Sequence, residues 1–144
     1  MNQLSWVRAA CAAIAATMPL IAASCSMGDH VETAKAGVDE FHARLAESKF
    51  EEIYADSASD FQDATTQEDA VKLFAAVITK LGKPISSSQS GWHVNFGTGG
   101  TVVTLEMQTE FERGKGVERY VFRISDGVAR LMSYHINSND LVVL

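Results

Sequence analysis

The clearest pattern in this sequence is TVVTLEMQTEFE, residues 101–112, in which side chains of two kinds alternate. Such a period of two is typical of a strand in an antiparallel sheet with one packed face and one solvated face. The packed face contains no charged residue, which favours a scaffold or a binding surface over a catalytic cluster. Its members are Val103, Leu105, Met107, Thr109 and Phe111.

The chain after this stretch is expected to turn back and pair with it. RGKG, residues 113–116, predicts a four-residue loop because its glycines suit a turn. With that loop length Glu110 faces Arg119. Glu106 then faces Arg123, so acidic side chains meet basic ones along the hairpin. A slip by one residue would lose this match, and we therefore expect the register to be specific.

A last strand is predicted over residues 128–137, after a turn at Asp126-Gly127. Its pattern is less regular than that of the first two strands. Leu131 and Tyr134 are three positions apart, an odd step, which indicates a β-bulge between them. The pattern leaves open whether Tyr134 or His135 faces the core.

Two amphipathic helices are predicted before the sheet. Apolar residues recur at every third or fourth position over residues 31–47 and again after residue 65. Thr65 with Glu68 forms a capping box that starts the second of these helices. Ser48 with Glu51 forms another, which predicts a short helix between the two.

The order of these elements predicts the fold class. Gly82 and Pro84 end the second long helix, and residues 92–96 alternate again before a glycine turn at residues 97–100. Helices followed by four antiparallel strands indicate an α+β fold, with N-terminal helices packed on a four-stranded antiparallel sheet. Residues 31–144 are enough for one such domain and too few for two.

The first 24 residues predict a lipoprotein signal peptide. Arg8 precedes an apolar run, residues 9–23, that is shorter than the ~20 continuous apolar residues of a spanning helix. The run ends in AASC, residues 22–25, which resembles the bacterial lipobox, where the cysteine receives the lipid. Cys25 is therefore the expected lipid attachment site, carrying palmitate-type acyl chains. Ordinary signal peptidase could also cleave here and release a soluble periplasmic protein.

The expected location is the outer membrane, on the side that faces the periplasm. Ser26 after the cysteine, rather than aspartate, favours outer-membrane sorting, and several acyl chains give a stable anchor. Residues 25–30 are interpreted as a short tether. Cys11 is removed with the leader, so the mature chain keeps one cysteine and has no internal disulfide.

Composition and motifs argue against several classes of function. Residues 25–69 hold twelve acidic and three basic residues, whereas a nucleic-acid partner requires a basic surface. No HxxxH, P-loop, GxSxG or GxGxxG motif occurs, so we expect no metal and no cofactor. The histidines are His30, His42, His93 and His135.

Several short patterns resemble a known family. They are Phe50-x-x-Ile-Tyr54, Trp92-x-Val-Asn95, Gly99-Gly-Thr-x-Val-Thr104, Tyr120-Val-Phe-Arg-Ile124 and Tyr134-x-Ile-Asn-Ser138. Through them residues 41–137 resemble small bacterial envelope proteins with an uncharacterised domain of the nuclear-transport-factor-2-like, or cystatin-like, superfamily. The resemblance implies a curved sheet wrapped around helices. It brings no established activity.

The resemblance leaves two functions open. The leading interpretation is a non-catalytic envelope module that binds a protein or small ligand through the concave face of the sheet, or that forms a homodimer. The alternative is a periplasmic isomerase or hydratase, as in the ketosteroid isomerases and dehydratases of the superfamily, with an enclosed acid–base pocket between sheet and helix. The candidates for that chemistry are Tyr54, Asp56, His93, Tyr134 and His135, although the tyrosines are more simply explained as core residues.

Overall fold

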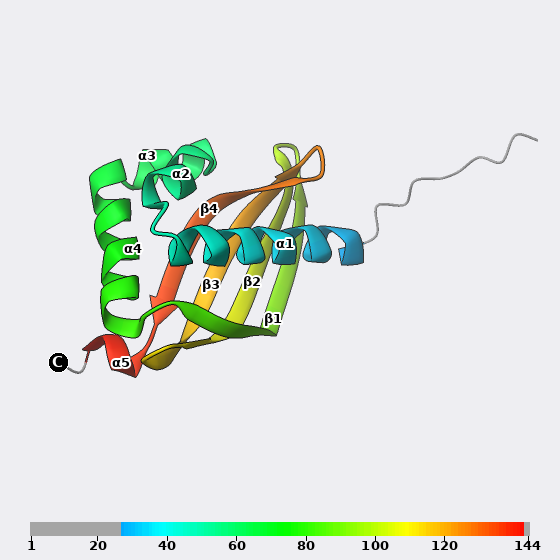
Figure 1. Ribbon diagram of the computed structural model, residues 1–144. Coiled ribbons are helices and arrows are strands. Elements are labelled where there is room, and N and C mark those ends of the chain that lie inside the picture. Colours follow the sequence, from blue (N-terminus) through cyan, green and yellow to red (C-terminus); the bar gives the residue numbers. More distant parts are fainter. Residues whose placement is uncertain (1–26, 143–144) are drawn as a thin grey trace, which may run out of the picture.

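Helices lie across one face of a single antiparallel sheet in the computed structural model, which describes residues 27–142 (Figure 1). The predicted signal peptide, residues 1–24, and the predicted lipid attachment site, Cys25, lie outside the described residues. The prediction of an α+β fold with helices on a four-stranded antiparallel sheet is confirmed. The elements are α1 (Met27–Ala46), α2 (Phe50–Ala55), α3 (Ser59–Ala64), α4 (Gln67–Leu81), β1 (Pro84–Gly97), β2 (Gly100–Phe111), β3 (Gly114–Ser125), β4 (Val128–Asn137) and α5 (Asn139–Val142).

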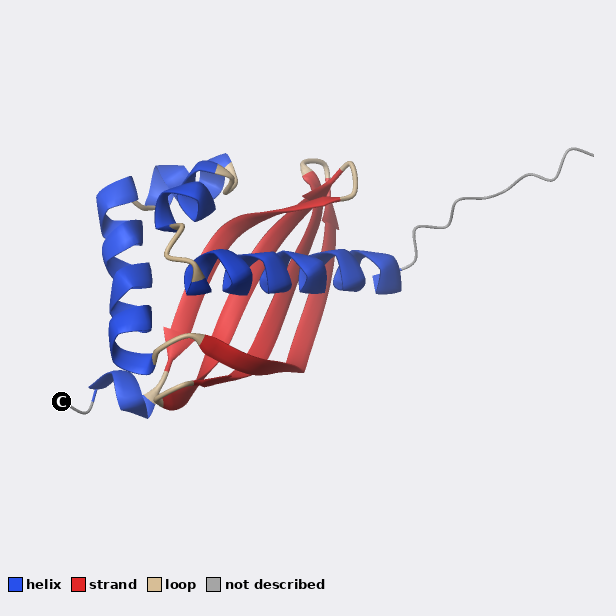
Figure 2. Cartoon of the chain, viewed as in Figure 1, coloured by secondary structure: helices blue, strands red, loops and turns tan. Residues whose placement is uncertain are grey.

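The strands follow one another in the order β1-β2-β3-β4, so β1 and β4 are the two edges of the sheet. Figure 2 shows α1 crossing the strands, with the shorter helices and α4 gathered at one side. The loop before α3 covers part of the β4 edge, because the backbone N–H of Ala58 donates to the carbonyl of Leu131 at 2.8 Å. Within the described part of the chain, no other segment makes a backbone hydrogen bond to the outer edge of β1, which is packed against β2 and beneath α1.

The register of the β2–β3 hairpin differs from the prediction. The loop contains two residues rather than four, so Glu106 faces Arg119 and Glu110 faces Lys115. The predicted pairs, Glu106 with Arg123 and Glu110 with Arg119, were therefore wrong. The shift amounts to four residues, and because four is an even number every side chain keeps its predicted face. Acidic groups still meet basic ones.

The tight loop is explained by contacts with the C-terminal end of α4. Arg113 Nη2 donates to the carbonyl oxygens of Ile78 and Thr79 at 2.8 and 2.7 Å. The backbone N–H of Arg113 donates to the carbonyl of Leu81 at 2.8 Å. Carbonyls at a helix end lack partners inside the helix, so this arginine satisfies them and fixes where the hairpin turns.

The helix ends differ from the predicted capping boxes. Helix α4 is capped by Thr66, whose Oγ1 accepts a hydrogen bond from the backbone N–H of Asp69 at 3.2 Å, one residue later than predicted. Ser48 has a φ of 58° between α1 and α2, and no side chain caps α2. Helix α1 begins at Met27, inside the segment interpreted as a tether. The short helix α3 was not predicted.

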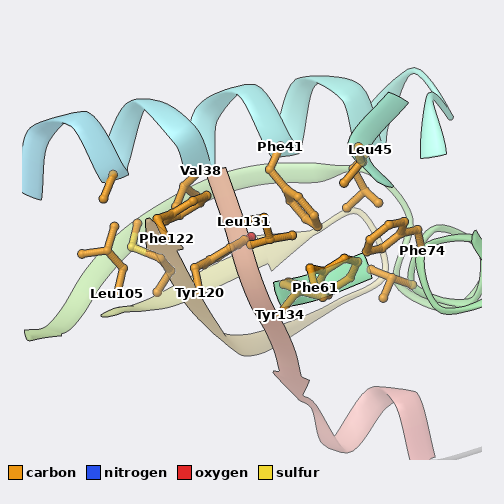
Figure 3. Close-up of a cluster of buried hydrophobic side chains, with 14 of the residues drawn as sticks. Val38, Phe41, Leu45, Phe61, Phe74, Leu105, Tyr120, Phe122, Leu131 and Tyr134 are labelled. Atoms are coloured by element: carbon orange, nitrogen blue, oxygen red, sulfur yellow. The ribbon is translucent and has the colours of Figure 1, made fainter. Parts of the chain in front are cut away.

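The core lies between α1, α4 and the concave face of the sheet (Figure 3). Figure 3 shows the side chain of Phe41 pointing from α1 toward the strands. Its ring centroid lies 4.8 Å from that of Tyr134 and 5.3 Å from that of Tyr120. Phe74 from α4 closes the same cluster at 5.5 Å from Phe41. Aromatic rings therefore fill the space in which an enclosed pocket was considered.

The irregular last strand contains the predicted bulge. Phe122 faces Leu131 while Val121 faces Ser133, so Met132 is the extra residue on β4. This extra residue shifts the alternation by one position. Tyr134 consequently faces the core, and the histidine that follows it points outward.

Candidate functional site

Three of the five candidate residues lie on the surface, far from any common site. His93 on β1 and His135 on β4 are exposed, and they sit on opposite edges of the sheet. Asp56 is exposed as well, and its Oδ2 pairs with Arg44 Nη1 at 2.7 Å. This pair lies at the rim of a hollow of about 260 Å³. The structure does not bring these three side chains together.

The two tyrosine candidates have different environments. Tyr54 is half-buried, and its hydroxyl donates to the backbone carbonyl of Thr65 at 3.0 Å, which ties α2 to the end of α3. Tyr134 is buried in the core, and its hydroxyl donates to Glu118 Oε1 at 2.7 Å. Of the predicted candidates, Tyr134 is the one that belongs to a cluster of ionisable groups.

The centre of that cluster is Glu118 on β3, whose side chain has no solvent exposure. Its Oε2 atom lies 2.7 Å from Nε2 of His42 on α1. The hydroxyl of Thr109 on β2 donates to the same oxygen at 2.6 Å. Together with Tyr134, these groups surround the carboxylate from one helix and two neighbouring strands. A buried charge is tolerated only when it is paired and hydrogen-bonded in this way.

Tyr120 adds a second phenol to the cluster. It is fully buried, and its hydroxyl oxygen lies 3.0 Å from Nε2 of His42. The Oγ1 atom of Thr109 also lies 3.1 Å from Oγ of Ser87 on β1, so the hydrogen-bonded chain reaches all four strands. We call Glu118, His42, Thr109, Tyr120 and Tyr134 the carboxylate cluster.

The local structure explains how these side chains meet. On α1, His42 follows the buried Phe41 and therefore lies at the flank of the apolar stripe, over the sheet. On β3 the period of two places Glu118 and Tyr120 on the same inward face. The bulge on β4 turns Tyr134 to that face. Each element thus contributes its group through ordinary periodicity.

The surroundings shift the acid–base properties of the cluster. Burial raises the pKa of Glu118, but the hydrogen bond and charge of His42, with the hydrogen bonds of Thr109 and Tyr134, outweigh it and hold the pKa below the ordinary value of 4.5. Burial and then the charge of Glu118 raise the pKa of Tyr134 well above 10.0. The same two causes raise the pKa of Tyr120. At neutral pH the cluster therefore holds a carboxylate and two neutral phenols.

A carboxylate, an imidazole and two phenols could in principle support acid–base chemistry. A substrate could not reach the cluster in this conformation, because Glu118 and Tyr120 are both fully buried. The hollows of about 260 and 690 Å³ are lined by neither of these side chains nor by His42. The geometry instead suits a structural role, in which the cluster joins α1 to the sheet.

Residues 101–112 contribute no charged side chain to the packed face, but Glu118 on β3 adds one, so interpreting the whole packed face as a scaffold without a polar cluster was wrong. A signal was present in the sequence, because Glu118 is in phase with the inward residues of the returning strand. An acidic residue at such a position indicates a buried charge. Its inward neighbours on β3 are Tyr120, Phe122 and Ile124.

A second feature of functional interest is the edge strand β1. Trp92 and Phe96 face Leu105 and Thr101 of β2, which places both aromatic side chains on the concave side of the sheet. They are nevertheless 53% and 59% exposed. The ring of His30, in the first turn of α1, lies 5.9 Å from that of Phe96. These exposed rings border the N-terminal end of the helix.

The described residues, 27–142, contain neither a candidate metal site nor a membrane-spanning helix. Within that part of the chain no group of three His, Cys, Asp or Glu side chains could hold a metal ion. None of its helices is long and apolar enough to cross a membrane. No known family model matches the sequence, and no curated protein shows significant similarity to it.

Proposed function

We propose that this protein is a lipid-anchored, non-catalytic interaction module of the bacterial envelope, and that strand β1 is its binding surface. The observation that carries the proposal is the character of this strand. Residues 84–97 include no lysine, arginine, aspartate or glutamate, yet they form an edge of the sheet with two exposed aromatic side chains. Edge strands in soluble proteins are usually protected by charges or by covering segments.

An exposed strand edge binds by adding a further strand. Unpaired backbone N–H and C=O groups supply the affinity, and alternate side chains supply the specificity. Trp92 and Phe96 would cover one face of an added strand, while His93 and Asn95 would line the other. Aromatic side chains of this kind dominate the energetics of protein interfaces because they bury large areas.

The anchor is proposed from the sequence around Cys25. Acylation of this cysteine would hold the domain at the outer membrane on its periplasmic side, and failure of acylation would leave a soluble periplasmic protein. The first residue of α1, Met27, is only two positions away. A module held on so short a connection meets partners at the membrane surface at a high effective concentration.

The anchor is tested by metabolic labelling with a fatty-acid probe. We expect label on the wild-type protein and none on Cys25→Ala. The binding surface is tested with a photoreactive residue placed at Phe96, with the same residue placed at His135 on β4 as the matched control. We expect a discrete cross-linked product from position 96 alone. Products from neither position, or equally from both, would overturn the assignment of β1.

A second candidate function is an isomerase or hydratase, which is favoured by the carboxylate cluster. It requires α1 to move away, because Glu118 has no solvent exposure in this conformation. Turnover of an enolisable ketone or an enoyl substrate that disappears in Glu118→Gln, with the fold retained, would favour this candidate. Absence of turnover in both proteins is the result expected for a non-catalytic module.

A further inference from the structure

Strand β1 and strand β4 are both edges of the sheet, but among residues 27–142 only the β4 edge receives a backbone hydrogen bond from a segment outside the sheet. On β4, the carbonyl of Leu131 accepts a hydrogen bond from Ala58 in the loop before α3. Strand β4 is also the shorter strand, and it is interrupted by the bulge at Met132. Strand β1 has fourteen residues and two bulges of its own, at Ile85 and Ser90. Its last seven residues, 91–97, pair without interruption and include no lysine, arginine, aspartate or glutamate. The two edges therefore differ in the devices that prevent strand addition.

The helix layer leaves room for an additional strand at the β1 edge. Figure 1 shows the N-terminal turns of α1 extending past β1, so the helix reaches beyond the edge of the sheet. Met27, in the first turn, is 50% exposed. The concave side of an added strand would lie under this turn, beside His30 and Phe96, whose rings are already in contact.

We propose that the occupant of this edge is a second copy of the chain, paired antiparallel through β1 of each copy across a twofold axis near Val94. The two four-stranded sheets would then form one continuous sheet. This inference rests on the proposed function, since it takes β1 as the binding surface and names the partner. A twofold interface of this kind requires the strand to be complementary to itself.

Strand β1 meets that requirement. With Val94 opposite its own copy, Trp92 lies opposite Phe96 of the second copy, and His93 lies opposite Asn95. Aromatic side chains then meet on the concave face and polar side chains meet on the convex face, as cross-strand pairs prefer. No pair of like charges is created, because residues 84–97 contain no acidic residue, lysine or arginine.

The pairing is also free of a clash between the two α1 helices. Each helix passes over its own β1 at Phe96, as the contact of that ring with His30 shows. In the proposed register Phe96 of the second copy faces Trp92, four residues away along the strand. At ~3.3 Å per residue the two helices would cross the joined sheet about 13 Å apart. Packed helices are 8–10 Å apart, so both fit over the interface.

The test uses the full-length exported protein with single cysteine substitutions, oxidised in the envelope. Val94→Cys places two thiols at the axis, within the Cα separation that a disulfide requires. We expect at least tenfold more reducible dimer from V94C than from H135C, a control on the β4 edge whose side chain is the more exposed of the two, or from the wild type. A dimer yield from V94C no higher than from these controls would overturn the proposal. Circular dichroism confirms that each variant is folded.

The register is tested by mixing two variants. Co-expression of tagged Trp92→Cys with Phe96→Cys should give the mixed disulfide in severalfold excess over either self-paired product. Phe96→Glu in the V94C background should reduce the dimer at least tenfold, because it places an unpaired carboxylate against Trp92 of the second copy. Self-paired products in excess, or a dimer unaffected by F96E, would overturn this register.

The photo-cross-linking experiment separates this inference from the function on which it rests. A product from position 96 with the mass of two copies supports both. A product with a different envelope protein, and none with the mass of two copies, leaves β1 as a binding surface and overturns the second copy as its occupant. The absence of any product overturns both.

Discussion

The carboxylate of Glu118 on β3 lies 2.7 Å from Nε2 of His42 on α1, and the two side chains join the helix layer to the sheet inside the core. Removing a charge from water costs several kcal/mol, which the partner and further hydrogen bonds must offset. Thr109 and Tyr134 supply those hydrogen bonds at 2.6 and 2.7 Å. The cluster is therefore a device for holding α1 in one position over the sheet, and its members can be tested one at a time.

Removal of His42 should leave the Oε2 atom of the buried Glu118 carboxylate without its partner on α1. We expect His42→Ala to lower the free energy of unfolding by about 3 kcal/mol or more, the range measured when one member of a buried pair is deleted. Urea denaturation monitored by circular dichroism measures this value. His135→Ala is the control, and because His135 is exposed we expect a change within about 0.5 kcal/mol. Equal effects of the two substitutions would show that the pair does not stabilise the fold.

Removal of the hydroxyl of Tyr134 should be more costly than removal of the hydroxyl of Tyr54. The first donates to the charged oxygen of Glu118, and the second donates to backbone carbonyls at a half-buried position. Hydrogen bonds to charged groups contribute about 1.5–3 kcal/mol and neutral ones about 0.5–1.5 kcal/mol. Tyr134→Phe should therefore lower the free energy of unfolding by about 2 kcal/mol, and Tyr54→Phe by about 1 kcal/mol. The reverse order in urea denaturation would contradict the assignment of Glu118 as an ionised acceptor.

The dependence of the free energy of unfolding on pH, measured in acid, should show whether Glu118 is ionised in the folded protein. Its pKa is lower in the folded protein than the ordinary 4.5, so the unfolded chain binds the proton more readily. The stabilisation is then present above pH 4.5 and is lost as the pH falls through the folded-state pKa. We expect the wild type to lose stability below pH 4.5 more steeply than Glu118→Gln, which cannot titrate. Parallel curves of unfolding free energy against pH would mean that Glu118 is not ionised in the fold.

The sequence was enough to predict which side chains lie on each face of the sheet, but not the register of the β2–β3 hairpin. Alternation alone determines which side chains point inward, and it correctly placed Leu105 and Met107 in the core. Register depends on where the loop closes, and that is determined by Arg113 binding the end of α4. A contact between residues 35 positions apart leaves no local pattern in the sequence.

The candidate site was missed for a similar reason. Glu118 lies in phase with the apolar positions of β3, so its burial could have been inferred from the strand pattern. Its partner could not, because His42 is 76 residues away and occupies the flank of a helical stripe rather than its centre. The candidates chosen instead, such as His93 and His135, lie where the chain is exposed.

The junction that sets the register of the β2–β3 hairpin depends on Gly82. Gly82 ends α4 with φ and ψ of 82° and −166°, a combination that is essentially confined to glycine. A Cβ atom there would lie 2.7 Å from Glu112 Oε2 and 2.8 Å from Glu112 Cβ. The same Oε2 accepts a hydrogen bond from the backbone N–H of Lys83 at 2.9 Å, so it is not free to move away without loss.

We expect Gly82→Ala to lower the free energy of unfolding by about 2 kcal/mol, because such backbone strain costs about 1–3 kcal/mol. Gly99→Ala is the matched control, since a Cβ at Gly99 would meet nothing within 4 Å. Its effect in urea denaturation should stay within about 0.5 kcal/mol. If Gly82→Ala were equally well tolerated, the end of α4 could adopt another conformation, and the explanation of the tight β2–β3 turn through Arg113 would fail with it.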